Sequence, residues 1–159
     1  MIFVTLGTQD KSFTRLLDLV QKQIDKGNIK GKVIVQTGYT KFKSNDMEIF
    51  DYIDNEKFNK LINECDLLIT HGGVGSILSG LRARKKVIAV PRLAKYKEHT
   101  NDHQLQIVEN FSQNGYILKL DDGDSLEDAL KQSKNFKPKK WKFNNANFLT
   151  KLKDYIDKN

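Results

Sequence analysis

The stretch from residue 67 to residue 78, Leu-Leu-Ile-Thr-His-Gly-Gly-Val-Gly-Ser-Ile-Leu, constrains the fold more than any other part of the chain. An apolar segment leads into three glycines and then into a sequence with helical spacing, which predicts a strand, a tight turn and a helix. Glycines allow sharp bends and close approach of a ligand, and the N–H groups that open a helix attract anions. The stretch therefore indicates either a phosphate site or a tight turn that binds no ligand.

Neither of the two common phosphate-binding motifs is present in this turn. A P-loop has Lys-Ser or Lys-Thr after its second glycine, which this sequence lacks. A dinucleotide-binding motif has a third glycine where Leu78 stands here. We expect the hydroxyl of Ser76 at the cap of the helix and the ring of His71 as a donor to a phosphate oxygen.

Strands and helices alternate along the chain, which predicts an α/β fold. Because the apolar runs are continuous rather than alternating, we expect a Rossmann-like parallel sheet with helices on both faces. The predicted strands occupy residues 2–6, 32–36, 48–53, 66–70, 86–90 and 115–118. A further helix is predicted to open at Ser125, and a terminal helix over residues 147–156.

Ligands of such sheets bind beyond the carboxyl ends of the strands. Three predicted loops belong to that edge: the residues after the first strand, the glycine turn, and residues 92–104. The fold class therefore predicts that these three loops meet at one site.

The composition narrows the classes of partner. The formal net charge is +7 over 159 residues, but no arginine-rich run, zinc pattern or aromatic RNA-binding signature accompanies it, so we expect no nucleic acid. The single cysteine, Cys65, favours a reducing cytoplasm. No run approaches the roughly 20 apolar residues of a membrane helix.

The positive charge is concentrated near the C-terminus. We expect residues 1–136 to form one Rossmann-like domain and residues 137–159 to form a basic segment with the terminal helix. The lysines of this region suit either an anionic membrane surface, with about 1 kcal/mol for each lysine near the lipid, or a solvated face. We expect the segment of residues 137–159 either to face a partner or a membrane, or to pack on its own domain.

A second group of polar residues follows Pro91. Asp102 and Gln104 are suited to holding sugar hydroxyls, because carboxylate and amide groups make directional hydrogen bonds. His99 and His103 are four residues apart, which is a metal-ligand spacing on a helix. Because no pattern supplies a third ligand, we expect no metal.

The glycine turn from His71 to Ser76, followed by the segment from Glu98 to Gln104, resembles the C-terminal domain of the family 28 glycosyltransferases. The resemblance covers residues 1–120, including Gly7 and Thr8 after the first strand. It is strongest with the short, split members of that family. These are the bacterial capsule and exopolysaccharide β-1,4-galactosyltransferase subunits and the catalytic subunit of the eukaryotic dolichol-linked UDP-GlcNAc transferase.

The resemblance implies a UDP-sugar site in the C-terminal, donor-binding half of a GT-B fold. It places uracil at the backbone of Ile53 and the donor sugar on Asp102 and Gln104. The residues implied for the diphosphate are Gly7, Thr8, His71, Gly73, Gly75 and Ser76. The candidates for catalytic groups are His71, Glu98, His99 and His103.

One position departs from the family pattern. Related full-length enzymes carry a glutamate that binds the ribose hydroxyls, on the helix after the glycine turn. That position is assigned to Gly80 here. The resemblance then leaves Glu98 or the backbone to hold the ribose.

The implied activity is inverting transfer of a hexose, galactose or GlcNAc, from a UDP-sugar to a lipid-linked saccharide in capsule or exopolysaccharide synthesis. No metal or other cofactor is expected. Because the chain has the length of one half of a GT-B enzyme, the implied partner is a membrane-anchored, acceptor-binding subunit. That partner would recruit the chain from the cytoplasm to the inner face of the membrane. The alternative is a non-catalytic subunit that binds the nucleotide sugar or regulates the complex.

Overall fold

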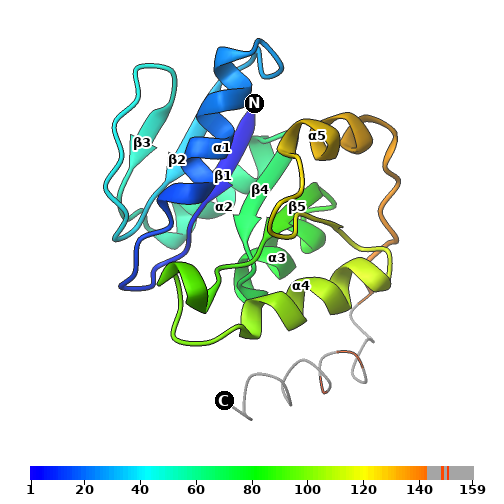
Figure 1. Ribbon diagram of the computed structural model, residues 1–159. Helices are drawn as coiled ribbons and strands as arrows, with labels where there is room; N and C mark the ends of the chain where they lie inside the picture. The colour runs from blue at the N-terminus through cyan, green and yellow to red at the C-terminus, as the bar shows by residue number, and fades with distance from the viewer. Residues whose placement is uncertain (143–147, 149, 151–159) are drawn as a thin grey trace.

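The computed structural model describes residues 1–142, 148 and 150. In this part of the chain, six parallel strands form one sheet in the order β3-β2-β1-β4-β5-β6, and their carboxyl ends lie toward the bottom of Figure 1. All neighbouring strands pair in parallel, as predicted. The strands are β1 (Ile2–Thr5), β2 (Val33–Gln36), β3 (Glu48–Phe50), β4 (Leu67–His71), β5 (Lys86–Val90) and β6 (Leu118–Lys119).

In the described residues a helix follows every strand except β2, and the helices cover the sheet on both faces (Figure 1). Those described are α1 (Thr14–Asp25), α2 (Asn55–Glu64), α3 (Val74–Arg82), the short 3-10 helix η1 (Ala94–Tyr96), α4 (His103–Gln113) and α5 (Leu126–Asn135). None of these described helices is long and apolar enough to cross a membrane.

Neighbouring residues on each strand pack on opposite faces of the sheet. Phe3 and Leu68 belong to the core formed with α2, α3 and α4. Val4 and Ile69 belong to the core formed with α1 and α5. Because both faces are covered, both sets of strand positions must be apolar, which explains the continuous apolar runs.

Two strands depart most from their predicted bounds. β3 ends at Phe50, and β6 begins only at Leu118. The delay in β6 has a local cause: Gly115 has a positive φ of 79°, and the N–H of Tyr116 closes the end of α4 on the carbonyl of Phe111. Ser125 caps α5 as predicted, because its side chain accepts from the N–H of Asp128.

The predicted terminal helix over residues 147–156 lies outside the described residues, apart from positions 148 and 150. Just before it, the basic segment contacts the domain. The N–H of Lys139 donates to the carbonyl of Gly115, and the ring of Trp141 packs against Phe111 and Tyr116.

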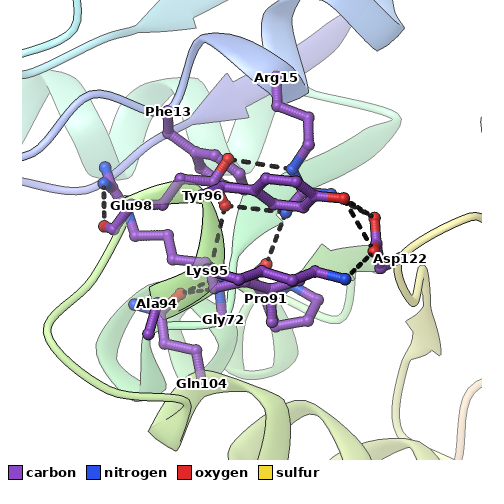
Figure 2. Close-up of polar contacts among 12 residues, drawn as sticks. Phe13, Arg15, Gly72, Pro91, Ala94, Lys95, Tyr96, Glu98, Gln104 and Asp122 are labelled. Atoms are coloured by element: carbon purple, nitrogen blue, oxygen red, sulfur yellow. Dashed lines mark hydrogen bonds and ion pairs between the residues drawn. The ribbon is translucent and has the colours of Figure 1, made fainter.

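The loop between β5 and α4 is held by buried charges. The guanidinium of Arg92, which is 1% exposed, donates to the carbonyls of Leu6, Lys11 and Glu98. The carboxylate of Glu98 accepts two hydrogen bonds from Arg15, at 2.9 and 3.0 Å, and one from the N–H of Leu93 at 3.1 Å (Figure 2). These contacts tie the loop to the segment after β1, beside the carboxyl edge of the sheet.

Candidate functional site

A pocket of about 600 Å³ opens at the carboxyl edge of the sheet, between the loops that follow β1 and β4. β1 and β4 are adjacent strands from which the chain proceeds to opposite sides of the sheet, and such a switch point is where parallel sheets bind ligands. The pocket is lined by Thr5, Gly7, Thr8, Gln9, Gln36, Tyr52, Ile53, Asn55, Phe58, Asn59, His71, Gly73, Gly75, Ser76 and Ser79.

The structure brings together all of the residues predicted around the diphosphate, and it adds Ile53 to the same pocket. The first turn of α3 forms one wall. Its first helical hydrogen bond runs from the N–H of Ile77 to the carbonyl of Gly73 at 3.2 Å. The N–H groups of Val74, Gly75 and Ser76 therefore precede the helical ladder and form the positive end of the helix dipole.

The cap of α3 differs from the prediction. Gly73 is the N-cap residue, so Ser76 lies in the first turn of the helix rather than at its cap. Its hydroxyl oxygen is 3.5 Å from Nε2 of His71. Ser76 therefore lines the pocket beside the histidine.

The ring of His71 is wedged between two glycines. A Cβ atom added at Gly7 would lie 2.6 Å from Nε2 of His71, and one added at Gly73 would lie 2.3 Å from Cε1. Gly7 also has a positive φ of 81°, which favours glycine. These two glycines thus make room for the imidazole as well as for the turn.

Burial, and secondarily the charge of Arg92, lowers the pKa of His71 to about 3. The ring is 6% exposed and is neutral at neutral pH. A general base works best with a pKa near the working pH, so this imidazole is poorly matched to accept a proton. It is well placed to donate a neutral N–H hydrogen bond into the pocket.

The segment that follows β5 is placed differently from the prediction. Glu98, His99, Asp102, His103 and Gln104 do not line the pocket described above. The carboxylate of Glu98 is 3% exposed and paired with Arg15, so its predicted contact with ribose and its predicted role as a base disagree with this placement. The buried ion pair occupies the oxygens that either role requires.

Gln104 also faces the protein rather than the pocket. Its side chain is buried and hydrogen-bonded to the backbone N–H groups of Gly72 and Arg92 and to the ring of His71. A direct contact with a sugar would require these bonds to break. Asp102 is exposed, and one of its carboxylate oxygens accepts from the N–H of Ala94 at 2.9 Å.

The two remaining histidines lie on different elements. His99 precedes α4, whereas His103 is the first residue of that helix, so their spacing does not place them on successive helical turns. Burial, with a smaller effect of Arg92, lowers the pKa of His99. No group of three metal-ligating side chains is found in the described residues.

Gly80 does not face the pocket. A Cβ atom at this position would lie 2.7 Å from Val87 and 2.8 Å from Leu68, inside the hydrophobic core. The assignment of the family's ribose-binding glutamate to Gly80 is therefore wrong, since no side chain fits there. The adjacent residue, Ser79, lines the pocket, and a group reaching a ligand from this turn of α3 would come from that position.

Several polar residues of the pocket were not predicted from the sequence. Gln36 ends β2, where its amide accepts from Thr5 and donates to the carbonyls of Gly7 and Asp51. Its position at a strand end was a usable signal, because that edge was expected to bind the ligand. Asn59, by contrast, lies inside α2, where the sequence gives no sign of the pocket.

Comparisons with known proteins show what the chain is similar to. Among curated proteins, the chain is similar to the UDP-N-acetylglucosamine transferase subunit ALG13 of Candida albicans, with 32% identity over 81 residues. It is also similar to ALG13 of Candida glabrata, with 34% identity over 98 residues. The matched parts are 51% and 59% of this chain, and only 26% and 46% of those proteins.

A solved structure supports the fold. The crystal structure of the glycotransferase of kitacinnamycin superposes with a TM-score of 0.62 at 16% identity, over 84% of this chain and 34% of that one. The fold is thus the Rossmann-like C-terminal half of a GT-B glycosyltransferase. The sequence pattern of the glycosyltransferase family 28 C-terminal domain matches residues 1–158, and the chain belongs to this family.

Proposed function

We propose that this chain is the donor-binding, catalytic subunit of a two-component inverting glycosyltransferase. The proposed reaction moves a hexose, galactose or GlcNAc, from a UDP-sugar to a lipid-linked saccharide in capsule or exopolysaccharide synthesis. The observation that carries the proposal is the neutral ring of His71, held between Gly7 and Gly73 beside the N-terminus of α3 in the pocket. The names of the curated relatives, subunits of UDP-N-acetylglucosamine transferases, support the donor class.

The two ends of the pocket suit the two ends of a nucleoside diphosphate. The N–H groups that open α3 and the N–H of His71 suit the diphosphate. The other end has Tyr52, Ile53 and Phe58, whose apolar surfaces suit a pyrimidine base. Asn59 of α2 and Ser79 of α3 line the same pocket, and they are the polar groups we assign to the ribose.

In this proposal, catalysis rests on stabilising the departing diphosphate. An acceptor hydroxyl attacks the anomeric carbon, the bond from that carbon to the diphosphate oxygen breaks, and negative charge grows on UDP. Preorganised N–H groups aimed at a developing charge are an effective form of catalysis. Since Glu98, His99 and His103 lie outside the pocket lining, we assign the group that takes the acceptor proton to the partner.

Exposed apolar side chains near the pocket support the proposal that a partner subunit binds there. Tyr39, Tyr52, Tyr96 and Leu105 are the large apolar side chains found exposed within the described residues, at 55%, 56%, 45% and 38%. They follow β2, β3 and β5 or open α4, so all belong to the carboxyl edge of the sheet. We propose that a membrane-anchored acceptor-binding subunit covers this edge and holds the chain at the inner face of the membrane.

The test is transfer of radiolabelled hexose from UDP-galactose or UDP-GlcNAc to lipid-linked acceptor by the chain co-expressed with its partner. The variant His71→Ala lacks this hydrogen-bond donor and is expected to reduce transfer by roughly 100-fold or more. Its circular dichroism spectrum should remain that of the folded chain. Wild-type rates in the folded variant would remove His71 from the mechanism. Full transfer by the partner alone would instead make this chain a regulatory subunit.

A further inference from the structure

Gln104 joins three parts of the site from one position. It is the second residue of α4 and is 3% exposed. Its side chain extends from the start of the helix toward Gly72 (Figure 2), where it contacts the turn after β4 and the segment after β5. The side chain also reaches the ring of His71.

The hydrogen bonds fix which way the amide of Gln104 points. The backbone N–H groups of Gly72 and Arg92 both approach the same atom of the amide, at 2.9 and 3.0 Å. Two N–H donors require an acceptor, so this atom is the oxygen Oε1. The atom that lies 3.1 Å from Nδ1 of His71 is therefore the amide nitrogen, which donates.

A donor at Nδ1 determines where the ring of His71 carries its proton. A neutral imidazole has one N–H and one acceptor nitrogen. Because Gln104 donates to Nδ1, the proton must be on Nε2. That nitrogen is beside Ser76, on the pocket side of the ring.

We propose that Gln104 is a positioning residue that holds His71 in the Nε2–H tautomer, so that an N–H rather than a lone pair faces a bound phosphate. The link to phosphate rests on the proposed function, whereas the link between the amide and the tautomer does not. The depressed pKa of His71 supports the argument, because only a neutral ring has a tautomer to select.

The test is nitrogen NMR of the three histidines in the ligand-free chain, labelled with ¹⁵N-histidine at neutral pH and assigned with single-histidine variants. We expect Nδ1 of His71 to have the shift of an unprotonated nitrogen and Nε2 to have that of a protonated one. The variant Gln104→Glu keeps an oxygen for the two backbone N–H groups but places a second oxygen against Nδ1. Nδ1 should then become protonated and its signal should move to the shift of an N–H nitrogen.

The matched control is Gln106→Glu, the same change at an exposed position two residues along α4, and it should leave both signals of His71 in place. A protonated Nδ1 in the wild-type chain would overturn the proposal, as would an unprotonated Nδ1 in folded Gln104→Glu. If that variant does not fold, the wild-type spectrum still decides. A separate titration with UDP tests the proposed function. The two results are independent, because the tautomer is measured without ligand.

Discussion

Replacement of Gly73 with alanine is expected to weaken binding of UDP by roughly 10- to 100-fold, the loss of a hydrogen bond to a charged group. The added Cβ would lie 2.3 Å from Cε1 and 2.8 Å from Nε2 of His71, far inside contact distance. The clash is with the ring itself, on its Cε1–Nε2 edge, so the ring has to shift to admit the methyl group. The imidazole must therefore leave its position, and the donor at Nε2 leaves with it.

Gly31→Ala is the matched control for this experiment. No atom lies within 4 Å of a Cβ built at Gly31, which is in the loop before β2 and is not among the pocket residues. Calorimetric titration of both variants with UDP, alongside circular dichroism, separates loss of the site from loss of the fold. Wild-type affinity in folded Gly73→Ala would show that UDP binding does not depend on the position of the His71 ring.

The second large effect is on stability, at the buried pair of Glu98 and Arg15. Glu98→Ala is expected to lower the free energy of unfolding by about 3 kcal/mol, the low end of the range for breaking a buried pair, because the side chain of Arg15 is 22% exposed. The substitution also leaves the buried N–H of Leu93 without its acceptor. Urea denaturation of the two proteins measures the difference.

An exposed ion pair provides the comparison. Lys60 and Glu64 lie one turn apart on α2, with 3.9 Å between their charged atoms and both side chains exposed. Glu64→Ala is therefore expected to cost about 0.5 kcal/mol or less. Equal losses in Glu98→Ala and Glu64→Ala would contradict a structural role for Glu98 and would return it to the list of candidate bases.

The fold was predictable because its pattern is local. Each strand is a short apolar run, and neighbouring residues such as Phe3 and Val4 serve opposite cores, so the sequence directly reflects a sheet covered on both faces. The glycine turn was predictable for a similar reason. Its residues are adjacent in sequence, and the pocket forms where they end β4 and open α3.

The roles of the residues after β5 were not predictable from type and spacing. A glutamate or a glutamine in a polar loop suits a ligand as well as it suits a neighbouring backbone group. Only the folded chain shows that Glu98 meets Arg15, from a helix more than 80 positions earlier, and that Gln104 meets His71. Both contacts depend on the path of the loop around the buried Arg92.

The error at Gly80 is of a different kind. Successive residues of a helix point about 100° apart. An error of one position in assigning a motif residue therefore moves the predicted side chain from the pocket into the core. Position 79 faces the pocket, whereas position 80 packs on Val87. The motif alone does not show which of these two neighbouring positions faces the pocket.

The most direct test of the donor-site proposal is calorimetric titration with UDP, with ADP and NAD as controls, on the isolated chain and on the chain co-expressed with its partner. We expect UDP-selective binding, because the apolar end of the pocket is assigned to uracil and the end at His71 to the diphosphate. Selectivity that appears only in the complex would mean that the partner completes the site. Preference for ADP or NAD, or no binding by the complex, would contradict a donor site for a UDP-sugar in this pocket.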